Sequence, residues 1–247
     1  MNNELKYKLE ACVASFESVK QAVAGGADRL ELCSHLSCGG LSPSPGLIRQ
    51  TIEYSPVPVN ILIRPRAGNF VYNKSELEII ECDIRYAHEI GAAGIVCGFL
   101  REDGSVDKEK TCYFRELSKP LSFTFHRAFD LCPDPFETLE DLIDCGIDRV
   151  LTSGQQNKAT EGIDLIEKLV EKAAGRIIIM PGGGINAENV GSFLEKRVVE
   201  VHASGSAEII SHSIIPEKPA LSDNIESDNR IMMTSKDKIA AIKAKLT

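Results

Sequence analysis

Short apolar runs alternate with amphipathic stretches along most of the chain. The amphipathic stretches carry apolar residues at three- and four-residue spacing, which is typical of helices that bury one face. The apolar runs are short and end near glycine or polar clusters, which indicates strands. The pattern predicts eight strands, at residues 9–15, 29–33, 59–65, 94–99, 122–129, 149–154, 176–183 and 200–206.

Each helical stretch ends close to the strand that follows it. Gly26, Gly91, Gly146 and Gly175 lie at these junctions, where a left-handed residue ends a helix. The strands are continuous apolar runs, as expected of parallel strands that are covered on both faces. Eight such units predict an α/β fold, a (β/α)₈ TIM barrel in a single domain over residues 1–247. A doubly wound open sheet is the alternative, although no G-x-G-x-x-G sequence follows the first strand.

The last unit departs from this pattern. Residues 207–235 are polar and interrupted by proline, so they predict an irregular loop before a closing helix at 236–247. A plain insertion explains such a loop, and a lid or a subunit contact is the functional alternative.

The net charge of the chain bears on the kinds of partner that it would attract. The chain has 247 residues and a net charge of −8, so it has no general attraction for nucleic acid or for an anionic membrane surface. We see neither a signal peptide nor an apolar run long enough for a membrane span. We therefore expect a cytoplasmic protein whose eight cysteines are mostly reduced, Cys82, Cys112 and Cys145 among them.

Polar side chains gather at the carboxyl ends of strands that otherwise resemble core. The first, second, third and fifth strands supply Glu10, Cys12, Glu31, Cys33, Arg64, Arg66 and His126. Active sites of TIM barrels lie at these strand ends, and residues two apart share one face of a strand. We expect Glu10, Glu31 and Arg64 to form an ion network. The alternative is that this network only fills the barrel and fixes the strand register.

Small residues follow the last two strands. Gly182, Gly183 and Gly184 come after the seventh, and Ser204, Gly205 and Ser206 come after the eighth. Loops at these places in barrels commonly bind phosphate through backbone N–H groups. With Arg66 they form the predicted anion-binding set. A tight turn that needs positive φ is the alternative explanation of the glycines.

Acid–base chemistry has four candidate residues, namely Glu10, Glu31, Arg64 and His126. Histidine ordinarily titrates near neutrality, which makes His126 the best single candidate. A histidine that is merely hydrogen-bonded inside the barrel is the alternative. A carboxylate–histidine pair with an anion site suits an isomerase, epimerase or lyase that acts on a small anionic or phosphorylated metabolite.

Five segments also resemble a known family. "GGADRLELCS", "IRPRAGNF", "TFHRAFD", "RVLTSG" and "IMPGGGI" are similar to the CutC family of copper homeostasis proteins, from about residue 8 to about residue 206. The resemblance implies a TIM barrel, a cytoplasmic location, a role in copper handling and a homo-oligomer, a dimer or a tetramer. It also implies copper(I) as the bound metal, with Cys12 and Cys33 as its ligands.

Two functions are therefore open at this stage. Thiolates are soft ligands that select copper(I), but a buried free cysteine is also an ordinary small core residue. In the first hypothesis the protein binds a copper ion for copper homeostasis. In the second it acts as an enzyme on a small anionic molecule. Whether the protein is an enzyme stays open.

Overall fold

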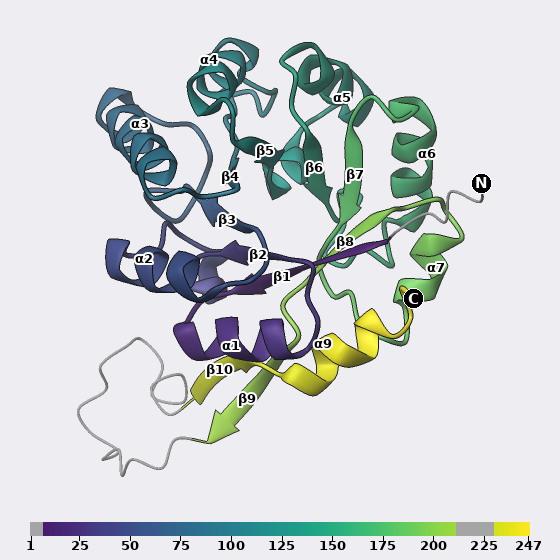
Figure 1. Cartoon of the computed structure of the whole chain (residues 1–247). Coiled ribbons are helices and arrows are strands. Elements are labelled where there is room, and N and C mark those ends of the chain that lie inside the picture. Colours follow the sequence, from purple (N-terminus) through teal and green to yellow (C-terminus); the bar gives the residue numbers. More distant parts are fainter. Residues whose placement is uncertain (1–6, 211–229) are drawn as a thin grey trace, which may run out of the picture.

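The computed structural model describes residues 7–210 and 230–247. Eight parallel strands lie at its centre, with helices around them (Figure 1). Their bounds are β1 (Lys8–Val13), β2 (Arg29–Leu32), β3 (Val59–Leu62), β4 (Gly94–Cys97), β5 (Ser122–Phe125), β6 (Arg149–Thr152), β7 (Ile178–Pro181) and β8 (Glu200–Ala203). The hydrogen-bonded ladder runs from β7 down to β1 and on to β8, and β7 contacts β8 across the remaining gap. The predicted TIM barrel is confirmed.

Helices alternate with these strands and cover the outside of the barrel. They are α1 (Phe16–Ala24), α2 (Pro45–Tyr54), α3 (Lys74–Glu89), α4 (Lys108–Ser118), α5 (Pro135–Asp144), α6 (Ile163–Ala173), α7 (Val190–Leu194) and α9 (Lys236–Lys243). Local sequence explains where they begin. Asn73 and Glu76 form a reciprocal capping box at the start of α3, and Asp134 caps α5 just before Pro135.

The fifth strand is shorter than the pattern suggested. The fifth strand ends at Phe125, and a 3₁₀ turn, η2 (Arg127–Leu131), takes up the rest of its apolar run. The side chain of His126 caps the start of this turn, because its Nδ1 accepts a hydrogen bond from the N–H of Ala128. The turn therefore places residue 127 beside the carboxyl ends of the strands.

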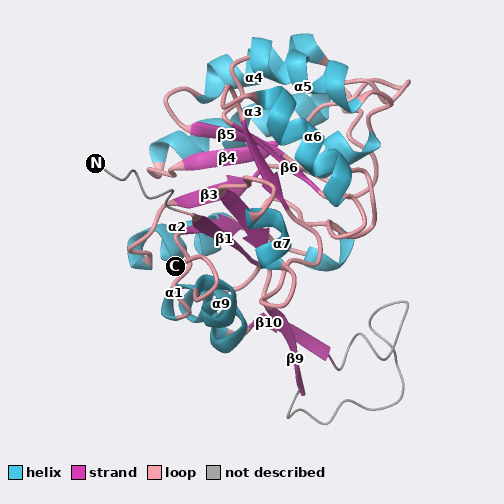
Figure 2. Cartoon of the chain, turned by 90° about the vertical axis from the view of Figure 1, so that its right-hand side faces the viewer, coloured by secondary structure: helices cyan, strands magenta, loops and turns pink. Residues whose placement is uncertain are grey.

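The segment 207–235 contains regular structure, so the prediction of an irregular loop was wrong for its two ends. Strands β9 (Ser206–Ile210) and β10 (Arg230–Thr234) pair antiparallel and form a ribbon outside the barrel (Figure 2). The ribbon is anchored where the N–H of Thr234 donates to the Ser18 hydroxyl of α1, at 3.1 Å. The polar residues that suggested a loop lie mostly at 211–229, outside the described residues.

One cysteine pair also departs from expectation. Cys112 of α4 and Cys145, just after α5, form a disulfide with their Cα atoms 4.7 Å apart. The prediction that both are free thiols was wrong, because neighbouring helices bring together positions that are 33 residues apart in sequence. Six cysteines are free: Cys12, Cys33, Cys38, Cys82, Cys97 and Cys132.

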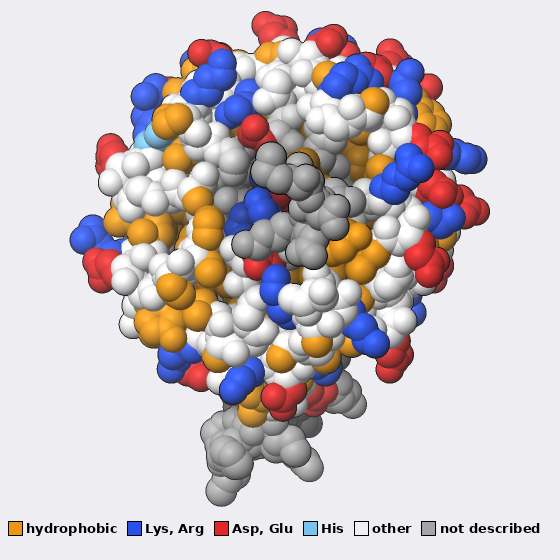
Figure 3. Space-filling model, turned by 45° about the vertical axis from the view of Figure 1, so that its right-hand side comes forward, with side chains coloured by type: hydrophobic (Ala, Val, Ile, Leu, Met, Phe, Trp, Pro, Cys, Tyr) orange, Lys and Arg blue, Asp and Glu red, His pale blue; other side chains and the backbone are white. Residues whose placement is uncertain are grey.

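Charged side chains of both signs lie on the surface of the protein. Acidic, basic and apolar side chains are interspersed over the face shown in Figure 3. Over residues 7–210 and 230–247, no helix has the length and apolar character needed to cross a membrane.

Candidate functional site

A cavity of about 420 Å³ opens at the carboxyl ends of the barrel strands. Residues from β1, β2, β3, β6 and β8 form its wall, together with the loops after β2, β3, β5 and β7. Its titratable and charged lining consists of Cys12, Glu31, Cys38, Arg64, His126, Arg127 and His202. Residues scattered over most of the chain therefore meet in one place, as the barrel topology requires.

Two thiols lie together in this region. The Sγ atoms of Cys12 and Cys33 are 3.7 Å apart, and the Cys12 Sγ also donates to Glu31 Oε1 at 3.4 Å. The arrangement follows from strand register, because Cys12 of β1 is paired with Glu31 of β2. Cys12 lines the cavity, whereas Cys33 is fully buried behind it and contacts the Val13 carbonyl at 3.5 Å.

The electrostatic surroundings keep Cys12 protonated in the metal-free protein. Its contact with Cys33, its burial and the nearby charge of Glu31 raise the pKa of the Cys12 thiol well above its usual value. A metal ion that binds here must displace this proton, because the thiolate is the ligand form.

Glu31 and His202 complete a possible metal-binding group. Ligand atoms of Cys12, Glu31 and His202 all lie within 4.8 Å of one another. Burial raises the pKa of Glu31, and its Oε2 atom has no hydrogen-bond partner in the described part of the chain. A buried oxygen without a partner is unfavourable, so a bound cation or donor would be accommodated here.

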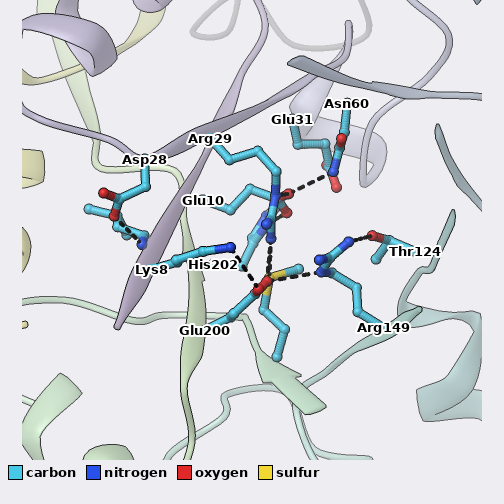
Figure 4. A network of polar contacts seen from close by, with 12 residues as sticks. Lys8, Glu10, Asp28, Arg29, Glu31, Asn60, Thr124, Arg149, Glu200 and His202 are labelled. Carbon is cyan, nitrogen blue, oxygen red and sulfur yellow. Dashed lines mark hydrogen bonds and ion pairs between the residues drawn. The ribbon is translucent and has the colours of Figure 1, made fainter. Parts of the chain in front are cut away.

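Glu10 lies beneath this group and fixes the orientation of His202 (Figure 4). Its carboxylate is 2.9 Å from His202 Nδ1, and it accepts hydrogen bonds from Arg29 Nε at 2.5 Å and Asn60 Nδ2 at 3.1 Å. Burial alone would raise the pKa of Glu10, but Arg29 and His202 lower it to about 2. Glu10 is therefore ionised, and His202 presents Nδ1–H to it.

The charged network continues toward the amino ends of the strands. Glu200 accepts hydrogen bonds from Arg29 Nη2 at 2.5 Å and from Arg149 Nε at 2.9 Å (Figure 4). The side chains of Arg29, Arg149 and Glu200 are all buried. The sequence pattern indicated Glu10 but not Arg29, Arg149 or Glu200. These three are the first residues of β2, β6 and β8, whereas the predicted site residues were those near the carboxyl ends of the strands.

Arg64 binds loop carbonyls and does not form the expected ion network with Glu10 and Glu31. Arg64 donates to the carbonyls of Cys38, Gly40 and Gly68 at 2.8–2.9 Å, and its guanidinium stacks over the Phe70 ring. It lines the cavity, but its hydrogen bonds go to carbonyls and not to Glu10 or Glu31.

Arg66 lies outside the cavity wall. Its guanidinium forms an ion pair with the Glu76 carboxylate and donates to the Asn69 carbonyl at 2.9 Å and the Val71 carbonyl at 2.8 Å. The predicted grouping of Arg66 with the glycines after β7 does not occur. The strand ends at Leu62, so the loop that follows is free to turn Arg66 toward α3.

His126 lies in the cavity wall, but it does not titrate near neutrality as we expected. Burial, and then the charge of Arg64, lower the pKa of His126 to about 3. Its Nδ1 accepts the Ala128 N–H at 3.3 Å, and the Phe70 ring packs against it with centroids 4.6 Å apart. Gly98 makes room for the imidazole, because a Cβ there would lie 2.6 Å from His126 Cε1.

The glycines after β7 have different roles. Gly183 and Gly184 line the cavity, with φ of +102° and +83°. Gly182 does not, and a Cβ at this position would lie 2.5 Å from Leu151 Cδ1 and 3.3 Å from His202 Cβ. Gly182 is therefore needed for close packing beside His202.

The small residues after β8 are divided between two hollows. Ser204 lines the main cavity and also a neighbouring one that α9 helps to form. Gly205 and Ser206 line only the neighbouring one, where Lys238 donates to the Ser206 carbonyl at 2.7 Å.

Comparison with known proteins gives the family. The model of the CutC family matches residues 7–207, which include every strand of the barrel. The chain belongs to the CutC family. A CutC family protein from Vibrio campbellii is 42% identical over 237 residues, covering 94% of this chain and 96% of the relative. The human copper homeostasis protein cutC homolog is 47% identical over 199 residues, covering 80% of this chain and 73% of the human protein.

Solved structures agree with the fold. The crystal structure of a CutC protein from Streptococcus agalactiae is similar with a TM-score of 0.77 and 34% identity, and the match covers 80% of this chain and 98% of that one. Thiamine phosphate pyrophosphorylase from Pyrococcus furiosus has a TM-score of 0.58 at 14% identity, with 99% and 98% covered. The second likeness concerns the fold alone.

Proposed function

We propose that this member of a copper homeostasis family binds copper(I) in the barrel cavity through Cys12 and Cys33. The observation that carries the proposal is the 3.7 Å separation of their Sγ atoms at the wall of a cavity, beside Glu31 and His202. Thiolates prefer soft ions such as copper(I), and hard cations prefer sites made only of oxygen. The donor set therefore suits copper(I).

Distance and charge both fit a single ion. Metal–thiolate bonds of about 2.3 Å allow two sulfurs on one ion to lie up to about 4.6 Å apart, so little rearrangement of the thiols is needed. Two thiolates and one copper(I) carry a net charge of −1. Burial alone would lower the pKa of His202, but Glu31 and Glu10 raise it, so His202 is well placed to offset that charge.

Anaerobic titration with copper(I) against a chromophoric competitor tests this site. We expect the parent to bind one equivalent tightly and Cys12→Ser/Cys33→Ser to lose that binding. Cys82→Ser is the matched control, because Cys82 is a free, exposed cysteine of α3. Copper(I) binding by the double variant as tight as that of the parent would rule the assignment out.

A second function is favoured by the size of the cavity. About 420 Å³ is much larger than one ion and lies in the range of small-molecule sites. We propose as the alternative an enzyme of the isomerase, epimerase or lyase type that acts on a small anionic or phosphorylated metabolite. Glu31 and His126 would contact the substrate, while Glu10 and Arg64 would position their neighbours. The same cavity can serve both functions.

Thermal unfolding in the presence of sugar phosphates tests this alternative. We expect a rise in melting temperature with at least one of them, and a smaller rise in Glu31→Gln, because that carboxylate lies in the cavity wall. No stabilisation by any phosphorylated compound would count against the enzyme.

A cytoplasmic location and a homo-oligomer, a dimer or a tetramer, are further proposals that rest on the family. Light scattering tests the oligomeric state.

A further inference from the structure

We infer that Arg127 and the backbone amides of Gly183 and Gly184 form a subsite for the carboxylate or phosphate group of a small organic anion. The subsite lies in the same cavity as Cys12 and Glu31. The inference rests on the second function proposed above and names the group by which its ligand is held. It also replaces Arg66, which lies elsewhere, as the cation of the anion site.

The guanidinium of Arg127 is fixed on one edge and available on the other. Its Nε donates to Asp130 at 2.8 Å, and its Nη2 donates to the Ser153 hydroxyl at 2.7 Å and the Gln156 carbonyl at 3.2 Å. Its Nη1 donates to no acceptor among residues 7–210 and 230–247. Nη1 lies 3.6 Å from the place a Cβ would take at Gly183, so it is beside the glycine turn.

Asp130 holds this arrangement in place. Its carboxylate accepts hydrogen bonds from the Thr152 hydroxyl at 2.5 Å, the Ser153 N–H at 3.0 Å and the Gln155 N–H at 3.1 Å. The Asp130 side chain is only 6% exposed, whereas that of Arg127 is 43% exposed. Asp130 is therefore a positioning residue, and the planar fork of Arg127 is pre-organised to bind an oxyanion.

The glycine turn supplies backbone donors. The Gly183 carbonyl accepts the Ala159 N–H at 2.9 Å, and the Gly184 carbonyl accepts from Asn189 Nδ2 at 2.8 Å. These bonds fix the two peptides, while neither the Gly183 nor the Gly184 N–H donates to a described residue. Successive backbone N–H groups in a turn conformation can form an anion-binding concavity.

A buried polar atom of His126 adds an independent observation that points to a ligand in the cavity. Because its Nδ1 accepts the Ala128 N–H, the neutral imidazole carries its proton on Nε2. This Nε2–H is buried and has no partner in the part of the chain that the structure describes. A buried donor without an acceptor is unfavourable, and a ligand oxygen in the cavity would supply the acceptor.

Amide resonances of uniformly ¹⁵N-labelled, metal-free protein provide the test. Inorganic phosphate and acetate are the two probes, and the tighter of the two identifies the group that the subsite prefers. We expect at least one to shift the Gly183 and Gly184 amide signals saturably. Arg127→Met should weaken that binding at least tenfold, and Arg127→Lys should fall between, since lysine keeps the charge but not the fork. Arg85→Met, on the surface of α3, is the matched control.

The results separate this inference from the copper site. Shifts retained in Cys12→Ser but lost in Arg127→Met would support an anion subsite that is independent of the thiols. No saturable shift at Gly183 and Gly184 with either probe would overturn the subsite, as would equal affinities of the parent and Arg127→Met. Copper(I) binding and stabilisation by sugar phosphates are measured separately, so the failure of either proposed function is recognised on its own.

Discussion

Replacing Glu10 with glutamine tests whether its buried negative charge holds the site together. Glutamine keeps the size of the side chain but removes the charge that faces Arg29 and His202. It also places an amide N–H₂ among three groups that all donate to Glu10, since Asn60 is the third. At least one donor is then left without an acceptor in a site that is fully buried.

The size of the effect follows from the pKa of Glu10. Its carboxyl has a pKa of about 2 in the folded protein against a usual value of 4.5, which corresponds to about 3 kcal/mol of stabilisation by the ionised form. Because the folded pKa is the lower one, this stability is fully present above pH 4.5 and is lost as the pH falls toward 2. We expect Glu10→Gln to cost about 3 kcal/mol at neutral pH, and less as the pH falls through that window.

Urea unfolding of both proteins at several pH values measures this cost. Other carboxyl groups have lowered pKa values too, such as Glu200 and Glu76, but they are present in both proteins and largely cancel in the difference. The control is Glu81→Gln, which breaks an exposed pair with Arg85 and should cost less than about 1 kcal/mol. A cost at neutral pH no larger than that control, or one that does not change with pH, would refute the reasoning.

Four further outcomes are expected. Gly182→Ala should lower the free energy of unfolding by about 1–3 kcal/mol, because its Cβ would overlap Leu151. Gly191→Ala, in helix α7 with open space around it, should raise the same quantity by about 0.5–1 kcal/mol in the same urea assay. Cys112→Ser/Cys145→Ser should lose about 3–4 kcal/mol under non-reducing conditions, and an unchanged urea midpoint would contradict the disulfide. Copper(I) affinity, measured by competition, should rise with pH by about a factor of ten per pH unit for each thiol proton released, and a flat profile would argue against thiolate ligands.

The barrel was predictable because its signal is repeated. Each unit carries a helical period and a continuous apolar run, and four of the junctions carry a glycine, so an error at one boundary leaves the eight-unit count unchanged. The ribbon of β9 and β10 occurs once and has no such support. Two five-residue strands next to polar residues could not be distinguished from a loop. The Cys112–Cys145 disulfide was missed because it depends on how α4 packs beside α5, which local periodicity does not specify.

Part of the site was also predictable from strand alternation. Residues two apart on β1 point the same way, so Glu10 and Cys12 both face the barrel interior, and register places Cys12 opposite Glu31. Alternation says nothing about the direction of side chains beyond a strand end. Arg64 and Arg66 follow β3, and the loop there turns both guanidiniums toward backbone carbonyls. The charged partners of Glu10 are instead Arg29 on β2 and His202 on β8.

Those partners do leave a signal in the sequence. An Asp-Arg pair occurs at the start of both β2 and β6, as Asp28–Arg29 and Asp148–Arg149. Each aspartate accepts the N–H of a residue in the preceding strand, Leu9 at 2.8 Å and Phe123 at 2.7 Å. Each arginine then enters the barrel and binds the same oxygen of Glu200.

The repeated pair explains how the barrel tolerates a buried charge network beneath a reactive site. Asp28 and Asp148 are partly exposed and fix the start of their strands. Arg29 and Arg149 enter the interior from β2 and β6, on opposite sides of the ring, and meet at one oxygen of Glu200. Arg29 is hydrogen-bonded to both Glu200 and Glu10, and Glu10 in turn contacts His202 at the cavity. The network is therefore structural around Glu200, toward the amino ends of the strands. At the cavity, it sets the orientation and charge of His202 through Glu10.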